Sequence, residues 1–249
     1  MSGLYMRDAA PLSQEEWAAL DHVIVEVAQQ FLVGRQFINL VGPLGPGQEL
    51  VPVGSGEKRK FLPLQLIQQD FTLMWRDIEA SRASGFPLEI GPAAQAAITC
   101  VRQEDQMIFD TLLKAAEKSV ALSDWDSEET PLSDVVKATE LLVKDDFFGP
   151  YAVILSPSMM TKTQRVSTAA GMLVSKMIKG VAKGGIFQSP LLEKDQGLVV
   201  SLGQYNLDLV VAQDLVTAYT GNEGLDHLFT VLESLVLRIK RPGALCKLG

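Results

Sequence analysis

The sequence predicts an α+β protein, because the segments that favour helices and those that favour strands lie in separate stretches of the chain. Two long helices are predicted, one at residues 14–33 and one at residues 91–119. Segments rich in Val and Leu, typical of strands, follow at 198–202, 207–212 and 228–240. The 249 residues are enough for one large domain or two modest ones.

The first helix is predicted from its start signal and its apolar spacing. Ser13 and Glu16 have the spacing of a capping box. One apolar face follows, with residues three or four positions apart: Trp17, Leu20, Ile24, Val27 and Phe31. Gly34 is well placed to end the helix in a left-handed conformation. The apolar face must be covered by the protein's own core, by a neighbouring subunit or by a bound peptide.

A protruding hairpin is predicted for residues 40–66. Residues 42–47 are rich in glycine and proline, which favour turns, and a polar tip containing Gly54 and Gly56 separates two extended pieces. Residues 70–78 are predicted to be another extended segment that leads into a short turn.

The second helix, at 91–119, is unusually long. Pro92 suits the first helical position, and the alanines that follow favour a helix. At 1.5 Å per residue it would be roughly 40 Å long, more than a small core needs. Its apolar residues form one stripe: Ala94, Ala97, Val101, Ile108, Leu112 and Ala115. Asp105 lies on this stripe and Glu104 beside it, which requires an explanation.

A second compact unit is predicted at about 121–213. After an acidic linker, its elements are a helix at 131–144, a buried strand at 151–155, one or two helices within 158–179 broken near Gly171, a strand after Gly185, and the strands at 198–202 and 207–212. Beyond this unit we expect a long strand at 228–240 and a short final strand near Cys246.

Composition argues against several classes of partner. The net charge is −8 and no basic run is longer than residues 58–60, so nucleic acid is not expected as a main partner. The two cysteines have no metal-binding or disulfide spacing, so no metal site is expected. The first residues do not resemble a secretory signal, and no apolar run is long enough for a membrane span. We therefore expect a cytoplasmic protein without a membrane partner.

No group of residues predicts catalysis. His22 and His227 lie in no metal-binding motif, and Cys100 is expected to be a small core residue. Residues 55–58 match SxxK, but such a short match in a polar tip carries little weight. The rival functional class is an enzyme such as a hydrolase or peptidase. The sequence offers no set of nucleophile, base and orienting residue that would support it.

Glu104 and Asp105 admit three interpretations. Neighbours on a helix point about 100° apart, so they do not converge on one proton as an acid/base pair would. One of them is expected to meet an arginine across an internal or subunit interface, where a bidentate pair fixes geometry. The remaining alternative is a solvated face.

The chain resembles the encapsulins, the shell proteins of prokaryotic nanocompartments, which share the Hong Kong-97 type major capsid fold of tailed phages. The resemblance extends nearly from end to end, through short motifs that keep their order: 10–12 with Trp17, 34–35, 42–45, 70–71, 75–79, 104–105 with 108–109, 149–151, 156–157, 213–215 and 237–240. Residues 75–79 (WRDIE) and 237–240 (LRIK) most resemble the family 1, linocin-like branch that stores iron by enclosing ferritin-like cargo.

The resemblance implies a division of the chain. Residues 1–39 would form the N-terminal helix and the start of a peripheral domain, and 40–66 an extended loop that overlaps a neighbouring subunit. Residues 67–120 would form the peripheral domain with its spine helix, 121–213 an axial domain, and 214–249 the return to the peripheral domain.

It also implies sites. A terminal peptide of the cargo would dock beside the N-terminal helix, on Ile24, Val27, Phe31, Arg35, Leu235 and Leu237, although these residues can equally be core. A five-fold pore loop would comprise Ser189, Pro190, Leu191, Leu192, Glu193, Lys194 and Asp195. Subunit-interface residues would be Glu104, Asp105, Lys58 and Arg59.

The implied partners are copies of the same chain, in a shell of 60, 180 or 240 subunits, and a cargo enzyme, ferritin-like or a peroxidase. Pores would admit small solutes. Flavin binds some members of the family, but no residue of this chain indicates a cofactor. A phage or prophage capsid protein is the alternative, disfavoured because a genome container usually needs a basic inner surface. The hairpin is short for the family, with only residues 53–60 between its arms, which predicts weaker overlap between subunits.

Overall fold

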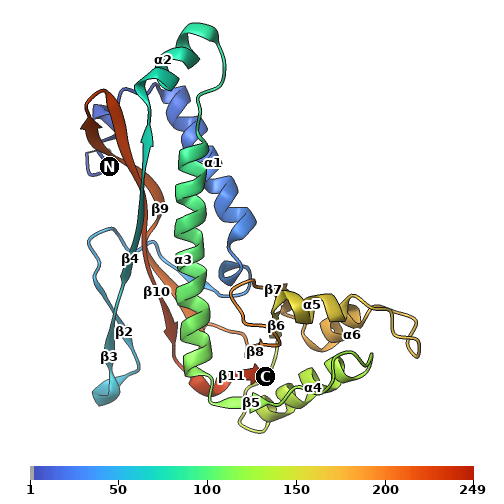
Figure 1. Cartoon of the computed structure of the whole chain (residues 1–249). Helices are drawn as coiled ribbons and strands as arrows, with labels where there is room; N and C mark the ends of the chain where they lie inside the picture. Colours follow the sequence, from blue (N-terminus) through green and yellow to red (C-terminus); the bar gives the residue numbers. More distant parts are fainter. Residues whose placement is uncertain (1–2) are drawn as a thin grey trace.

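The long helix α3 (Gly91–Ala115) is the axis of the larger of two units in the computed structural model, which describes residues 3–249. Pro92 lies in its first turn, as predicted. The helix ends before residue 119 because residues 118–120 form strand β5 (Lys118–Val120) of the second unit. The two units meet at an angle, which gives the chain an L shape (Figure 1).

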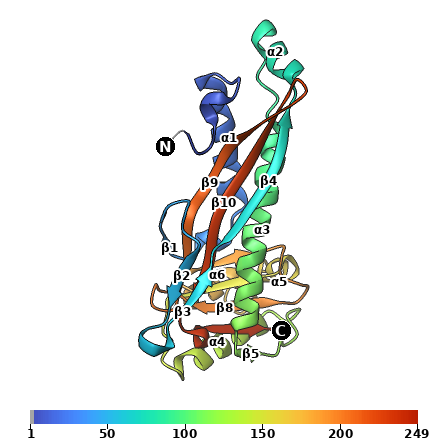
Figure 2. The same cartoon turned by 90° about the vertical axis from the view of Figure 1, so that its left-hand side faces the viewer.

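A four-stranded sheet covers one side of α3. Its order is β1 (Leu40–Val41), β9 (Leu207–Glu223), β10 (Asp226–Ile239) and β4 (Gln65–Leu73). Figure 2 shows the three long strands side by side. Helix α3 packs on β4 and β10, while α1 (Gln14–Phe31) packs on α3 and reaches β9. Apolar side chains from both helices and the sheet form the larger core.

The second unit is built on a five-stranded sheet. Its order is β5, β11 (Leu245–Leu248), β8 (Gly197–Ser201), β6 (Tyr151–Leu155) and β7 (Gly185–Gln188). Helices α4 (Thr130–Val143), α5 (Pro157–Thr163) and α6 (Val174–Val181) complete it. The predicted buried strand, the helix break near Gly171 and the final strand are therefore confirmed.

The domain boundary predicted between residues 213 and 214 is wrong. Strand β9 runs without interruption from Leu207 to Glu223 inside the first sheet. The final strand β11 lies in the stretch assigned to the first unit, but it belongs to the second sheet, where it pairs with β8 and β5. Each unit is thus assembled from distant segments, because strand pairing and not chain order decides membership.

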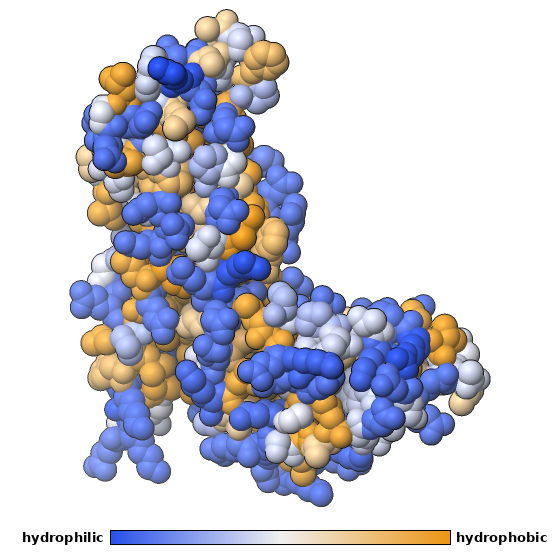
Figure 3. All heavy atoms as spheres, in the orientation of Figure 1, coloured by the Kyte–Doolittle hydropathy of each residue, from blue (hydrophilic) through white to orange (hydrophobic). Residues whose placement is uncertain are grey.

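The predicted hairpin is a two-stranded ribbon, β2 (Leu50–Val53) and β3 (Lys60–Pro63), joined by the 3-10 turn η3 (Gly56–Lys58). Val51 on its inner face is buried against Val210 and Val236 of the long sheet. The outer face exposes Leu50 and Phe61. Figure 3 shows a hydrophilic foot at the lower left, where Figure 1 places the tip of this ribbon.

The extended segment predicted at 70–78 is only half correct. Strand β4 ends at Leu73, and α2 (Trp75–Ser84) begins directly after it. The Asp226 carboxylate accepts a hydrogen bond from the Trp75 backbone N–H at 3.0 Å, so a residue distant in sequence satisfies an N–H of the first turn. No local signal reveals such a partner.

The remaining elements are short 3-10 turns: η1 (Arg7–Ala9), η2 (Gly34–Gln36) and η4 (Pro242–Ala244). Within residues 3–249, no helix combines the length and apolar character needed to cross a membrane. The same residues contain no group of three or more His, Cys, Asp or Glu side chains arranged to hold a metal ion.

A groove beside the first helix as the candidate functional site

Helix α1 is held in place at both ends. At its start the predicted capping box is confirmed: the Glu16 N–H donates to Ser13 Oγ at 3.2 Å, and the Ser13 N–H donates to Glu16 Oε2 at 2.6 Å. Arg82 of α2 also binds the Glu16 carboxylate, at 2.9 and 3.0 Å. Trp17, Leu20, Ile24 and Val27 are buried, so the protein's own core covers the predicted apolar face except at Phe31.

The end of α1 is anchored by Asp105. Its carboxylate accepts hydrogen bonds from the backbone N–H groups of Val33 at 2.8 Å and Gly34 at 2.9 Å. Gly34 does not adopt the predicted left-handed conformation; the helix ends at Phe31, and Gly34 begins η2. Glycine is required there by close approach, because a Cβ would lie 2.6 Å from Ile108 Cδ1. Burial raises the pKa of Asp105 to about 6, against the lowering effect of its two backbone donors.

Arg35 joins three carboxylates from three elements. It binds Glu104 of α3 through Nε at 2.8 Å and Nη2 at 2.8 Å, Glu233 of β10 through Nη2 at 2.9 Å, and Asp214 of β9 through Nη1 at 2.7 Å. Glu104 and Glu233 are fully buried, whereas 59% of the Asp214 side chain is exposed. Burial disfavours the Arg35 cation, but Glu104 and then Asp214 outweigh that effect and raise the pKa of Arg35.

Glu233 is the carboxyl that a single guanidinium cannot neutralise. Burial and the negative charge of Glu104 raise the pKa of Glu233 to about 9. The raised pKa therefore favours the protonated form of the Glu233 carboxyl at neutral pH. We call Arg35, Glu104, Asp214 and Glu233 the carboxylate cluster.

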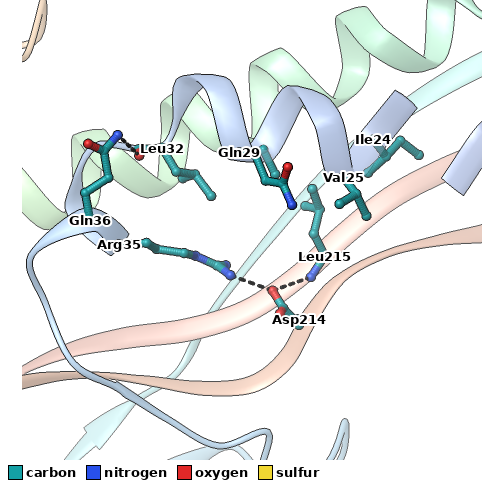
Figure 4. A pocket seen from close by; sticks show the side chains of 9 residues that line it. Ile24, Val25, Gln29, Leu32, Arg35, Gln36, Asp214 and Leu215 are labelled. Atoms are coloured by element: carbon teal, nitrogen blue, oxygen red, sulfur yellow. Dashed lines mark hydrogen bonds and ion pairs between the residues drawn. The ribbon is translucent and has the colours of Figure 1, made fainter. Parts of the chain in front are cut away.

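A groove lies above this cluster, with a volume of about 340 Å³ (Figure 4). One wall is α1, and the other is the Asp214–Leu215 segment of β9. Figure 4 shows Arg35 reaching across the groove to Asp214, whose carboxylate also accepts the Leu215 N–H at 2.9 Å. The groove is therefore mostly apolar with an acidic rim. Its lining residues are Ile24, Val25, Ala28, Gln29, Leu32, Arg35, Gln36, Asp214 and Leu215.

The structure divides the six predicted docking residues. Ile24 and Arg35 line the groove. Val27, Leu235 and Leu237 are buried in the core, so that a ligand cannot reach them in this conformation. Phe31 is 46% exposed but does not line the groove. For the three buried residues the structure favours the alternative that they belong to the core, because an apolar period identifies a covered face without showing what covers it.

Sequence reasoning missed most of the groove. From α1 to η2 the missed positions are 25, 28, 29, 32 and 36, a second stripe at helical spacing. That spacing was readable, but Gln29 and Gln36 interrupt its apolar character. Asp214 and Leu215 come from β9, far away in sequence, and only folding brings them to the helix.

Glu104 and Asp105 do not lie at a subunit interface. Both are buried, at 0% and 4% exposure, and their partners Arg35, Val33 and Gly34 belong to the same chain. The predicted arginine partner exists, and the interface it spans is internal. Lys58 and Arg59 are exposed at the ribbon tip, and their contact with another subunit stays a prediction.

The predicted pore loop connects β7 to β8 and is partly built into the core. Ser189 and Leu192 are buried, and Leu192 belongs to the larger core. Pro190, Glu193 and Lys194 are exposed. The free end of the second unit in Figure 1 is instead the connection between α5 and α6. Leu191 and Asp195 are half-buried, so within the predicted loop Pro190, Glu193 and Lys194 are the residues most open to a solute.

Replacing Asp105 with alanine is expected to destabilise the fold by about 2–3 kcal/mol, because two charge-assisted hydrogen bonds are lost and two backbone N–H groups lose their acceptor. Chemical denaturation of the purified protein measures this. Asp110→Ala, on the same helix and half-buried, serves as the control. An Asp105→Ala protein with unchanged stability and assembly would show that the anchor is unimportant.

Comparisons with known proteins agree with this architecture. The chain matches the family described as "Encapsulating protein for peroxidase" over residues 1–236. It is 40% identical to the type 1 encapsulin shell protein EncA of Myxococcus xanthus, over 96% of this chain and 93% of that protein. It is 35% identical to a diheme-cytochrome–encapsulin shell fusion protein of Kuenenia stuttgartiensis, over 95% of this chain and 73% of that protein.

Solved structures give the same fold. The virus-like particle of Pyrococcus furiosus matches with a TM-score of 0.80 at 21% identity, covering 95% of this chain and 99% of that chain. The capsid of the phage XM1 matches with a TM-score of 0.61 at 9% identity, over 87% and 91% of the two chains. The chain therefore has the capsid fold of the Hong Kong-97 type predicted above. Within that class, the chain belongs to the encapsulin family.

Proposed function

We propose that this chain assembles into a closed protein shell that encloses a cargo enzyme, and that the groove beside α1 holds a terminal peptide of that cargo. Membership of a shell-forming family supports the first part. The observation that carries the second is an apolar groove of about 340 Å³ that no other part of the described chain fills. The Kuenenia fusion, whose name joins a diheme cytochrome to a shell, supports the association of a second protein with such a shell.

The walls of the groove define the peptide that fits. Val25, Ala28 and Leu215 offer apolar surface, which favours small or branched apolar side chains. Asp214 is largely exposed at the rim and favours a nearby lysine or arginine. A second hollow of about 540 Å³, lined by Leu4, Tyr5 and residues 43–46, shares Asp214 with the groove. A peptide of several residues can therefore continue from one hollow into the other.

Blocking the groove tests this proposal. The probe is a fluorescent protein that carries the terminal peptide of the enzyme encoded beside the shell gene, co-expressed with the shell. Ala28→Arg places a large cation in the groove and is expected to reduce the encapsulated fluorescence at least about 10-fold. Gln30→Arg introduces the same group on the exposed face of the same helix and should load normally. Equal loading in both shells would refute the groove as the docking site.

Cargo, pores and location follow as parts of the same proposal. A ferritin-like iron-storage protein or a peroxidase is the proposed cargo; the family description and a ferritin-like–encapsulin fusion of Pyrococcus furiosus, 25% identical over 76% of this chain, support this. Solutes would enter through pores, for which Pro190, Glu193 and Lys194 are the proposed lining. Assembly is proposed to take place in the cytoplasm.

Assembly itself is tested by electron microscopy of the purified protein. We expect closed particles of uniform diameter, built from 60, 180 or 240 copies, and a monomer or dimer would reject the shell. The ribbon is proposed to lie on a neighbouring subunit, because its outer face exposes the apolar side chains of Leu50 and Phe61.

Lengthening the ribbon tip between Gly54 and Lys58 is expected to raise the melting temperature of the shell, because a longer ribbon would overlap more of its neighbour. The alignment with the Myxococcus protein extends over 268 residues, more than this chain contains, so the relative carries residues that this chain lacks. Differential scanning calorimetry of assembled particles measures the effect. A glycine-serine insertion of equal length in the loop at 164–173 is the control, and equal melting temperatures would contradict the expectation.

A further inference from the structure

A cluster of cations lies where the ribbon meets the long sheet. The chain has a net charge of −8, yet Lys58, Arg59 and Lys60 follow one another at the ribbon tip. Arg238, near the end of β10, and Lys240, just after it, lie beside the ribbon: the Arg238 Nη1 group donates to the Pro52 carbonyl at 2.9 Å, and both side chains line a cavity with residues 52–54. Positive charge therefore gathers at one place on an acidic protein.

The carboxylate of Asp208 beneath this place is already neutralised. Asp208 is 1% exposed and binds Arg238 twice, through Nε and Nη2, each at 2.8 Å. Lys240 Nζ lies 2.6 Å from the same carboxylate. Burial would raise the pKa of Asp208, but Arg238 and Lys240 together hold it below its usual value. Two cations on one anion leave an excess positive charge.

A cavity of about 350 Å³ opens above this pair. Its walls are Arg59, Arg238, Lys240 and the backbone at residues 52–54. No carboxylate lines the cavity, and Arg59 makes no ion pair within residues 3–249. The volume is ample for a small tetrahedral anion. Three cationic groups thus surround a space that holds no negative charge of the protein.

We propose that this cavity is a binding site for a phosphate-type oxyanion. Guanidinium groups bind such anions with fixed, paired N–H donors, and an ammonium group adds a point charge. Arg59 belongs to the ribbon side of the cavity, and Lys240 follows strand β10 of the long sheet. A bound oxyanion would therefore tie the ribbon to the sheet and fix the orientation of the ribbon. This inference does not depend on the cargo groove, which lies elsewhere on the chain.

Calorimetric titration of the assembled full-length protein with inorganic phosphate, at constant ionic strength kept with sodium chloride, tests the site. We expect saturable binding by the wild type. Arg59→Gln should weaken it at least about 10-fold, because one of the three cations is lost. This variant is expected to fold, since Arg59 is exposed and makes no ion pair within the described chain. Lys58→Gln, one residue away and outside the cavity, is the matched control and should bind as the wild type does.

Thermal melting gives a second readout. Millimolar phosphate should raise the melting temperature of the wild type and of Lys58→Gln more than that of Arg59→Gln, because a ligand stabilises the state that binds it. General stabilisation by an excluded salt would be equal in all three proteins. The proposal is overturned if binding is not saturable, if Arg59→Gln binds as well as the wild type, or if Lys58→Gln loses as much affinity as Arg59→Gln.

Discussion

Replacing Arg35 with methionine is expected to lower the free energy of unfolding by about 3–5 kcal/mol, more than the loss of the Asp105 carboxylate does. Methionine keeps most of the apolar volume but removes the cation that Glu104, Glu233 and Asp214 share. Glu104 and Glu233 have no exposed surface, so water cannot replace the lost partner. Denaturant titration monitored by tryptophan fluorescence measures the loss.

A double mutant separates this charge effect from lost packing. Arg35→Met with Glu104→Gln removes the stranded negative charge, and more than half of the lost stability should return. Arg35→Lys keeps the positive charge but lacks the paired N–H groups with which Arg35 binds Glu104. The stability of this variant should therefore lie between those of the wild type and Arg35→Met. If the double mutant is as unstable as the sum of its two single mutants, the pair is not coupled and the interpretation of the cluster is wrong.

The second large effect is a loss of stability as the pH rises. The pKa of Glu233 is about 9 in the folded protein against 4.5 for an unperturbed glutamate, because burial and Glu104 disfavour its charge. Between these values the folded state holds a proton that the unfolded state has released. Stability from this group is therefore complete below about pH 4.5 and is lost as the pH rises towards about 9. Because one proton is released on unfolding, the free energy of unfolding falls by about 1.4 kcal/mol for each pH unit in this range.

The titration of Asp105 also lowers the stability of the fold as the pH rises, but over a narrower range of pH. Burial raises its pKa from 3.8 to about 6, so its contribution is complete below about pH 3.8 and is lost as the pH rises through about 6. The pKa values of the Asp134 and Asp208 carboxyls are lowered, so the stability that these groups contribute is instead lost as the pH falls into the acid range. Above pH 6 the loss of stability with rising pH should therefore come mainly from Glu233.

Replacing Glu233 with glutamine isolates the contribution of this carboxyl to the pH dependence of stability. Its amide is neutral, as the protonated acid is, so the variant should resemble the wild type near pH 5 and exceed it in stability at pH 8–9. Melting temperatures recorded from pH 5 to 9 give the comparison. Glu26→Gln removes an exposed carboxyl of α1 and should leave the wild-type slope unchanged. Parallel curves for Glu233→Gln and the wild type would show that Glu233 is ionised throughout.

Local patterns were sufficient to locate the elements that form from their own residues. Ser13 and Glu16 placed the start of α1, and Pro92 with its alanines placed the start of α3. The ribbon, β6 and β10 were also found, because turn residues and apolar runs bound them. The start of α2 was missed, because its N–H partner Asp226 lies more than a hundred residues away.

The site was harder to predict, because most of its residues meet only in space. Arg35 was singled out only through the resemblance to the encapsulins, and Glu104 by its charge beside an apolar stripe. Their mutual contact, and the arrival of Asp214 and Glu233, depend on β9 and β10 pairing beneath α3. The boundary at residue 213 failed for the same reason, since β9 continues through it.

Periodicity and capping residues were enough to predict an α+β fold built around one long helix, and the order of short motifs was enough to show the resemblance to the encapsulins, because each of these signals lies within a few neighbouring residues. They raised the problem of Glu104 and Asp105 without solving it. Folding places Glu104 against Arg35 and Asp105 against the end of α1, inside one chain, and leaves the groove between α1 and β9. Such contacts follow from strand pairing and helix packing over long distances in sequence, which local spacing does not encode.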